Sequence, residues 1–228
     1  PLVAPVLVGV PQEARATLAQ LRDWLERLLN QPVQDWLNQH RDADAFAHWC
    51  RHHAHNLPPA RCLAAWHPLA RTLAPQTRNL DLLSADTTVQ SAHLQAVAQS
   101  IATDPDFVQH PLWRGQCAQT GVWTRLRHQA QCDTLHHNAW TRLGARWREL
   151  VNITAADPIT TNGHRDALLD SGALPLGEGQ AIAWCEMARG LLLHWVQLDP
   201  QGRVQDYRVL APTEWNFHPD GALAQALA

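Results

Sequence analysis

The chain has 228 residues, of which 46% are hydrophobic, so it can bury the core of one large domain or of two small ones. Its formal net charge of −3 gives no electrostatic basis for binding nucleic acid or an anionic membrane surface. The apolar stretch of residues 1–10 is too short to span a bilayer and lacks the basic residues of a signal peptide. We therefore expect a soluble, cytoplasmic protein.

Helices are expected over most of residues 1–154. Leu18, Leu21, Leu25 and Leu28 recur at steps of three and four residues, which predicts an amphipathic helix over residues 11–29. Asp86 is the predicted N-cap of a later helix. The same apolar spacing predicts helices over 42–55, 58–73 and 86–101, from about 122, and over 133–151.

The pattern changes after residue 154. Residues 155–179 are rich in Asp, Gly, Pro and Thr and predict a loop. Short strands are expected over 180–187, 191–198 and 203–210, and the turn Asp199-Pro200-Gln201-Gly202 joins the last two strands. The expected fold is mostly α with a small antiparallel β unit near the C-terminus. It divides into a helical part, 1–154, and a loop-plus-hairpin part, 155–228.

The five cysteines do not form a recognisable framework. No two of them are spaced as a CxxC pair, and their number is odd, so neither a set of disulfides nor a structural zinc site of ordinary spacing is expected. They are Cys50, Cys62, Cys117, Cys132 and Cys185.

Three segments resemble the large subunits of nickel–iron hydrogenases. Residues 111–125 read PLWRGQCAQTGVWTR and are similar to the family's Pro-x-aromatic-x-Gly loop, which leads into Glu-Thr-Gly or Glu-Val-Gly and then Arg. Residues 186–195 read EMARGLLLHW and are similar to the family's E-A-P-R-G-A-L-x-H-W. Residues 209–216 read VLAPTEWN and are similar to V-x-x-P-T-T-W-N. Agreement in order and spacing over three segments is a stronger signal than one short motif.

The cysteines depart from the family pattern. A large subunit has two CxxC pairs, one near each end, whose four thiolates hold nickel and iron. This sequence has neither pair and ends at Ala228, before the expected place of the second. A site that needs four thiolates cannot be built from these residues, so hydrogen turnover is not expected. The chain is therefore more similar to maturation proteins of the HupK/HoxV type, which are large-subunit paralogues. We expect a single cut-down large-subunit-like domain, residues 1–228, that is not an enzyme.

The resemblance also implies a function. The protein is expected to be a scaffold that transiently holds an Fe(CN)2CO fragment for transfer to the hydrogenase large subunit, and it is not expected to bind nickel. The implied partners are a small chaperone of the HypC type, the large-subunit precursor and other maturation factors. Two alternatives remain: a metal-free mimic of the large subunit that docks maturation factors, and a divergent hydrogenase subunit with ligands supplied by a partner.

The resemblance places the binding residues in the second and third segments. Arg189 matches the family arginine over the active site, and its five N–H donors suit a cyanide nitrogen or a carboxylate. Thr213, after the rigid Pro212, matches the hydroxyl that donates to a cyanide. Glu186 completes the predicted cofactor-binding set. The structural alternatives are an ion pair between Arg189 and Glu186 and a capping role for Thr213. Ala188 replaces the family proline.

Cys50 is the candidate iron ligand. It lies in Trp49-Cys50-Arg51-His52-His53-Ala54-His55, roughly where a large subunit has its first cysteine pair and the following histidine. Arg51 and a protonated histidine are expected to lower the pKa of the thiol and favour thiolate. The alternative is a core cysteine on the apolar face of a helix.

The other polar residues of this kind are read as structural. His48, His52, His53 and His55 are crowded, but a solvated or partner-contact face is favoured over a metal site. Gln119 stands where the family often has Glu, so a proton-transfer carboxylate is missing. Packing is the favoured reading for Cys117 and Cys185, Cys62 and Cys132 have no supporting context, and the core is predicted for Trp195 and Trp215.

Overall fold

The structure of the protein is a computed structural model that describes residues 12–40, 43–74, 77–84, 86–129, 138–155 and 171–228. Within these residues the chain divides into two compact units. We call residues 77–125 and 171–228 the sheet unit, and residues 12–74 and 126–155 the helical unit, in each case over the described positions. No helix in the described part of the chain is both long enough and apolar enough to cross a membrane.

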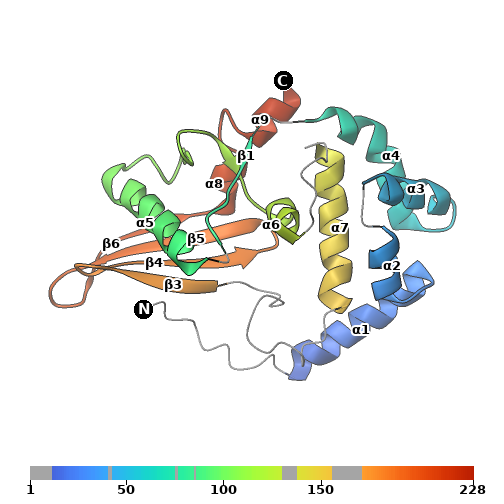
Figure 1. Cartoon of the computed structure of the whole chain (residues 1–228), viewed down its shortest axis with the longest axis horizontal. Coiled ribbons are helices and arrows are strands. Elements are labelled where there is room, and N and C mark those ends of the chain that lie inside the picture. The colour runs from blue at the N-terminus through green and yellow to red at the C-terminus, as the bar shows by residue number, and fades with distance from the viewer. Residues whose placement is uncertain (1–11, 41–42, 75–76, 85, 130–137, 156–170) are drawn as a thin grey trace. The chain divides into compact units, whose positions relative to one another are not determined.

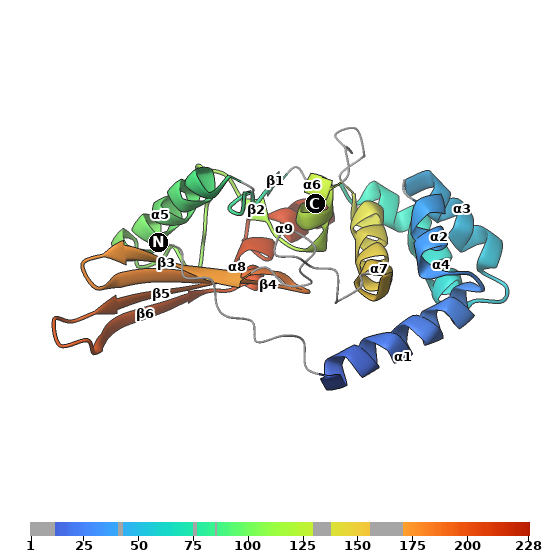
Figure 2. The same cartoon turned by 60° about the horizontal axis from the view of Figure 1, so that its bottom comes forward.

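The helical unit is an assembly of helices around α7 (Ala139–Ala155), which contacts the first four helices of the described chain. These are α1 (Gln12–Leu29), α2 (Val33–Gln39), α3 (Ala43–His53) and α4 (Pro58–Thr72). Figure 2 shows α7 beside α2 and α4. The predicted helices over 11–29, 42–55 and 58–73 are confirmed, whereas the short α2 was not predicted.

Aromatic rings form the centre of the helical unit. Trp36 is fully buried and makes edge contacts with the rings of Phe46 and Trp49, and Phe46 stacks on Trp140 with ring centroids 5.1 Å apart. Gly144 permits this close packing of α7, because a Cβ there would lie 3.1 Å from the Phe46 ring. Burying aromatic side chains of this size provides a large share of the hydrophobic stabilisation.

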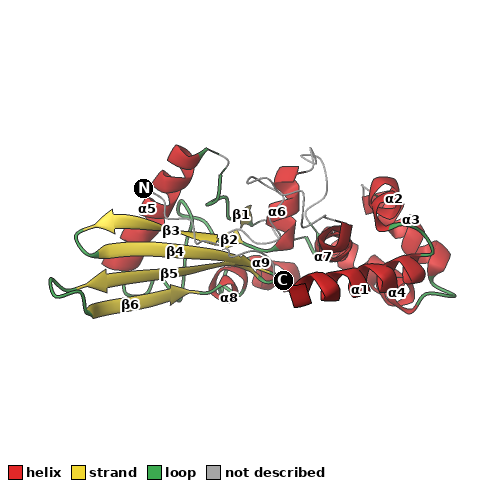
Figure 3. Cartoon of the chain, turned by 90° about the horizontal axis from the view of Figure 1, so that it is seen from below, coloured by secondary structure: helices red, strands yellow, loops and turns green. Residues whose placement is uncertain are grey.

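The sheet unit contains a four-stranded antiparallel sheet. Its strands lie side by side in chain order, as Figure 3 shows. They are β3 (Ser171–Gly177), β4 (Gln180–Met187), β5 (Gly190–Leu198) and β6 (Val204–Leu210). The predicted antiparallel β unit near the C-terminus is thus confirmed, but it is larger than the strands expected from the sequence.

Strand β3 corrects the prediction of a loop over 155–179. Its sequence, SGALPLG, contains three residues that are rare in strands. Pro175 is tolerated because β3 is an edge strand, where a missing N–H breaks no central ladder. Gly172 leaves space for the Trp184 ring, which a Cβ would approach to 2.3 Å. Residues 156–170 of the expected loop lie outside the described part of the chain.

The hairpin between β5 and β6 agrees with the sequence prediction. Asp199 N–H donates to the Arg203 carbonyl at 2.8 Å, and the Asp199 carboxylate accepts from the N–H groups of Gln201 and Arg203. Gly202 adopts φ +77°, the conformation for which glycine is favoured. The Leu191–Val196 stretch is not fully covered on both faces, because Leu191, Leu193 and Trp195 are buried while the residues between them are half-buried.

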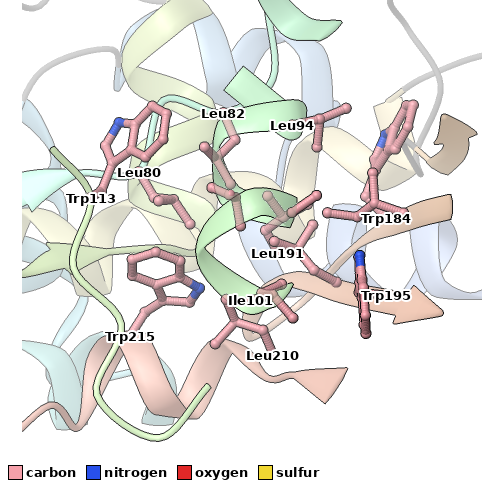
Figure 4. Close-up of a cluster of buried hydrophobic side chains, with 14 of the residues drawn as sticks. Leu80, Leu82, Leu94, Ile101, Trp113, Trp184, Leu191, Trp195, Leu210 and Trp215 are labelled. Carbon is pink, nitrogen blue, oxygen red and sulfur yellow. The ribbon is translucent and has the colours of Figure 1, made fainter. Parts of the chain in front are cut away.

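Helix α5 (Thr87–Thr103) covers one face of the sheet (Figures 1 and 2). Asp86 is its N-cap, as predicted, and the carboxylate accepts from Thr88 N–H at 2.8 Å. Figure 4 shows Leu94 and Ile101 of this helix packed with Trp184 and Leu191 of the sheet. Trp195 and Trp215 are buried in the same core, as predicted.

Short elements lie around the end of the sheet at which β4 stops and β5 starts. Two-residue strands β1 (Arg78–Asn79) and β2 (Ala118–Gln119) pair in parallel. Helix α6 (Val122–Gln129) begins in the sheet unit, α8 (Pro212–Asn216) follows β6 directly, and α9 (Ala222–Leu227) ends the described chain. The two units do not follow the division near residue 154 that the sequence suggested, because α5 and the loop after it pack on the sheet.

Candidate functional site

The three segments that resemble hydrogenase large subunits meet in the sheet unit, and Asn216 joins them. Its side-chain oxygen accepts from Thr120 N–H at 2.9 Å, and its Nδ2 donates to the Thr120 carbonyl at 3.0 Å and to the Arg189 carbonyl at 3.4 Å. The side-chain amide of Asn216, the last residue of α8, therefore holds both the loop before α6 and the turn between β4 and β5. We call Thr120, Arg189, Thr213 and Asn216 the three-segment junction.

A glycine allows the closest approach in this junction. Gly190 has φ +129°, and a Cβ there would lie 2.5 Å from Thr120 Cγ2. The next residue, Leu191, donates its N–H to Thr120 Oγ1 at 3.0 Å. A side chain at position 190 would thus push the turn away from Thr120 and break this contact.

Arg189 presents its guanidinium at the surface while its backbone is held by Asn216. Within the described residues, its side chain makes no hydrogen bond or ion pair. The ion pair with Glu186 that was the structural alternative for Arg189 is therefore not formed; Glu186 instead faces Arg125, at 4.0 Å from Nη1. Arg125 Nη1 also donates to the Met187 carbonyl at 3.0 Å, which fixes the end of β4.

Thr213 and Pro212 lie at the start of α8. Pro212 is buried at the first helical position, where a missing N–H costs nothing. Thr213 is half-buried, and its Oγ1 lies 3.5 Å from Glu214 Oε1, at the outer limit of a hydrogen bond. Residues three apart lie on one helical face, so Thr213 shares a face with Asn216, about 5 Å along the axis. Thr213 thus lies one helical turn from the residue that contacts Arg189.

Gln119 is buried beside the junction, and its Nε2 donates to Asn79 Oδ1 at 3.2 Å. A neutral amide suits this position, because an ionised carboxylate there would lose its hydration.

Cys50 lies in the helical unit and is fully buried in the core of that unit. Burial raises the pKa of the Cys50 thiol to about 12, and the opposing effect of Arg51 is smaller. The expected lowering of the pKa by Arg51 and a histidine is therefore wrong, because desolvation of the thiolate dominates. The role of Cys50 as an iron ligand stays a prediction.

The histidines near Cys50 lie along α3 and just beyond its end. His48 and His52 stack with ring centroids 6.2 Å apart, and both are exposed. Burial, followed by the neighbouring His52, lowers the pKa of His53. Among the residues that the structure describes, no three His, Cys, Asp or Glu side chains are arranged to hold a metal ion.

A second pair of polar residues links the same segments as Asn216 and Thr120. Cys117 Sγ lies 3.2 Å from His218 Nδ1, although the two residues are 101 positions apart. From the sequence, Cys117 was expected to be a packing residue, and no role was predicted for His218. No spacing rule connects them, and the only available signal was that each lies within three residues of a hydrogenase-like segment or inside one. Cys132 lies outside the described residues, Cys62 is exposed, and Cys185 is partly buried in β4.

Comparison with known proteins gives a consistent family relationship. The nickel-dependent hydrogenase family matches residues 127–226, a range that includes two of the three hydrogenase-like segments. The hydrogenase expression/formation protein HoxV of Cupriavidus necator is 40% identical over 98% of this chain, and the hydrogenase expression/formation protein HupK of Bradyrhizobium diazoefficiens is 37% identical over 59% of it. The uptake hydrogenase large subunit of Cupriavidus necator is 28% identical over 42% of the chain.

The lengths of these proteins differ. The chain spans 57% of the length of HoxV, 36% of that of HupK and 14% of that of the large subunit. No solved structure matches the chain. By sequence, the chain is a relative of the hydrogenase expression/formation proteins HoxV and HupK, and part of it also resembles a hydrogenase large subunit.

Proposed function

We propose that the protein is a non-catalytic assembly scaffold in the maturation of nickel–iron hydrogenase. It holds an Fe(CN)2CO fragment transiently, before the fragment is transferred to the large subunit. The proposal is supported by the relatives, whose names refer to hydrogenase expression and formation. The observation that carries it is the three-segment junction, in which a hydrogenase-like arginine is held by its backbone while its guanidinium stays unpaired within the described residues.

The junction has the donors that this cargo requires. Cyanide nitrogens accept hydrogen bonds strongly, and a guanidinium supplies several N–H donors without ever losing its charge. Arg189 binds one cyanide in this proposal, and its positive charge offsets the negative charge that cyanide brings. Because Asn216 fixes the Arg189 carbonyl, only the side chain has to be ordered when the cargo binds.

Thr213 supplies the second donor. Its hydroxyl makes only a long contact with Glu214, so little is lost when it turns to a new acceptor. Pro212 fixes the backbone from which the hydroxyl projects. Glu186, paired with Arg125, stabilises the end of β4 that leads to Arg189.

The cysteine content favours a protein that holds the iron fragment over an enzyme that turns over hydrogen. No CxxC pair occurs in these 228 residues, so they do not offer the four thiolates of a nickel–iron site. A scaffold needs weaker ligation than an enzyme, because its cargo has to leave. The proposed partners are a small HypC-type chaperone, the large-subunit precursor and other maturation factors.

Infrared spectroscopy tests the proposal. Bound carbonyl and cyanide absorb in a spectral window where protein has no bands. Protein purified from cells that contain all maturation factors is expected to show these bands, and protein from cells without the cyanide-forming factors is expected to lack them. A spectrum without bands in both preparations contradicts the proposal.

The metal-free mimic is the competing function, and the burial of Cys50 favours it because the predicted iron ligand is inaccessible. If protein without carbonyl and cyanide bands in the infrared captures the large-subunit precursor, the result would support the mimic. Hydrogen-dependent dye reduction by the purified chain would support the divergent-subunit alternative instead.

A further inference from the structure

The pair formed by Cys117 and His218 lies beside the three-segment junction and is held on both sides by backbone contacts. Cys117 directly precedes β2, and its carbonyl accepts from Arg78 N–H at 3.2 Å. His218 begins a tight turn in which Gly221 N–H donates to the His218 carbonyl at 2.8 Å. The pair is therefore positioned by rigid backbone rather than by a flexible loop tip.

The hydrogen bonds around His218 fix which atom is the acceptor. Asp220 N–H donates to His218 Nδ1 at 3.1 Å, so Nδ1 carries a lone pair and the ring proton is on Nε2. The Cys117 sulfur lies 3.2 Å from the same nitrogen, so the single Nδ1 lone pair is shared between the thiol and the Asp220 N–H. A sulfur and an unprotonated ring nitrogen, both of which are metal-ligating atoms, therefore converge on one point.

The spacing suits a metal ion. A cation about 2.3 Å from sulfur and about 2.0 Å from nitrogen needs the two atoms to be about 3.1–3.5 Å apart for ligand angles between octahedral and tetrahedral. The observed separation of 3.2 Å falls in this range. The separation therefore permits both atoms to ligate one cation once the Asp220 N–H has released the Nδ1 lone pair.

The pair is not arranged for thiolate catalysis. Burial, followed by the charge of Asp220, raises the pKa of the Cys117 thiol. The pair is therefore unlike a catalytic thiolate–imidazolium dyad, which needs a lowered thiol pKa. The same carboxylate that opposes a bare thiolate attracts a metal cation.

We propose that Cys117 Sγ and His218 Nδ1 form a two-ligand site for a thiophilic divalent cation of the iron, cobalt or zinc class. Binding forms one bond from sulfur and one from nitrogen, displaces two waters from the hydrated cation and releases the thiol proton to solvent. The Asp220 N–H loses its acceptor in the process. Among the described residues no third ligand completes the site, so the remaining positions are filled by ligands that the cation brings.

A site with only two protein ligands suits a preassembled metal fragment, which brings its other ligands with it. Only the identification of that fragment as the cargo rests on the proposed function; the metal site itself does not. Two protein ligands hold such a fragment loosely enough to be displaced by a site with more thiolates.

Titration of the purified 228-residue chain with Co²⁺ tests the site, because thiolate ligation gives a sulfur-to-cobalt charge-transfer absorption. We expect the absorption in the wild-type chain and expect Cys117→Ser to lose it. In His218→Gln the apparent affinity for Co²⁺ is expected to fall about tenfold or more, because losing a ligand costs at least as much as losing a residue that supports a ligand. Cys185→Ser is the matched control, because Cys185 is a partly buried thiol of the same unit, and it is expected to retain the absorption.

A second measurement uses the unmodified chain and needs no variant to fold. Zn²⁺ is expected to slow the alkylation of Cys117 in peptide maps while leaving that of the exposed Cys62 unchanged. Equal cobalt absorption in wild type and Cys117→Ser, or alkylation of Cys117 that Zn²⁺ does not slow, would overturn the site.

The two proposals fail separately. Infrared bands in a chain whose Cys117 binds no cobalt would leave the scaffold function in place and remove this site. Cysteine-dependent cobalt binding in a chain without infrared bands would keep the site and remove the iron fragment as its cargo.

Discussion

The side-chain amide of Asn216 makes both backbone hydrogen bonds of Thr120, to its N–H at 2.9 Å and to its carbonyl at 3.0 Å. This contact spans 96 positions in the sequence and behaves like a short piece of added strand. The same amide reaches the Arg189 carbonyl. Each of the three hydrogenase-like segments therefore supplies part of a single junction.

Asn216→Ala tests the junction. The substitution leaves the two half-buried polar groups of Thr120 unpaired, and we expect the free energy of unfolding to fall by about 1–3 kcal/mol in urea denaturation. Gln95→Ala, at an exposed position of α5 in the same unit, is the control and is expected to change stability by less than about 0.5 kcal/mol. Equal stability of the two variants would contradict the bonding role of Asn216.

Gly190→Ala tests the close approach to Thr120. A Cβ at 2.5 Å from Cγ2 adds a clash to the cost of a positive φ, and a loss of about 2 kcal/mol or more is expected. Gly202→Ala is the matched control, because Gly202 also has a positive φ but no atom within 4 Å of the added Cβ. Its cost should be limited to about 1–2 kcal/mol.

Thr120→Ser removes the methyl group, Cγ2, that an added Cβ at position 190 would approach most closely. When it is combined with Gly190→Ala, it is expected to recover part of the lost stability. A double variant no more stable than Gly190→Ala would show that the methyl group is not the cause.

Cys50 is expected to be unreactive in the folded protein. Because it is fully buried and its pKa is raised to about 12, iodoacetamide at mildly alkaline pH should label Cys62 and leave Cys50 unmodified until urea is added. Mass spectrometry of the peptides measures both. Labelling of Cys50 at the rate of Cys62 would contradict its burial.

The raised pKa of Cys50 also predicts that the stability of the protein depends on pH in the alkaline range. Between the ordinary thiol pKa of 9.0 and about 12, the unfolded chain loses the Cys50 proton while the folded chain keeps it. The free energy of unfolding therefore falls as pH rises through this window, by up to about 1.4 kcal/mol per pH unit. Cys50→Ala should show a shallower fall over the same window, and an unchanged slope would contradict the assignment.

Thr213→Val tests the second proposed donor. The change keeps the shape of the side chain and removes its hydroxyl, so a cyanide band of the bound fragment is expected to shift in the infrared. Thr103→Val is the control, because the Thr103 hydroxyl is at an exposed position of α5, donates to the Gln99 carbonyl of the same helix, and should leave the spectrum unchanged. Identical spectra for both variants would remove Thr213 from the site.

Local chemistry allowed much of the fold to be predicted. Asp86 and Asp199 act through neighbours a few residues away, so the start of α5 and the β5–β6 turn follow from sequence alone. Strand β3 could not be predicted, because the reason for Gly172 is the Trp184 ring on the paired strand. Only the folded chain brings the two together.

The candidate site shows the same limit. Arg189 and Thr213 were identified through their motifs, but the bond through Asn216 that brings their segments together depends on tertiary structure. For Cys50, the charge of Arg51 is visible in the sequence, whereas the burial that outweighs it is not. The pairing of Cys117 with His218 joins residues 101 positions apart and left no periodic signal.

The most direct test of the scaffold is the infrared spectrum of the Arg189→Gln variant, purified from cells that contain all maturation factors. Arg203→Gln is the matched control, because Arg203 is an exposed arginine paired with Asp199 in the β5–β6 turn. The wild-type chain and Arg203→Gln are expected to show carbonyl and cyanide bands, and Arg189→Gln is expected to lose them or to shift its cyanide bands. A wild-type chain without bands, or an Arg189→Gln spectrum identical to that of wild type, would contradict the account.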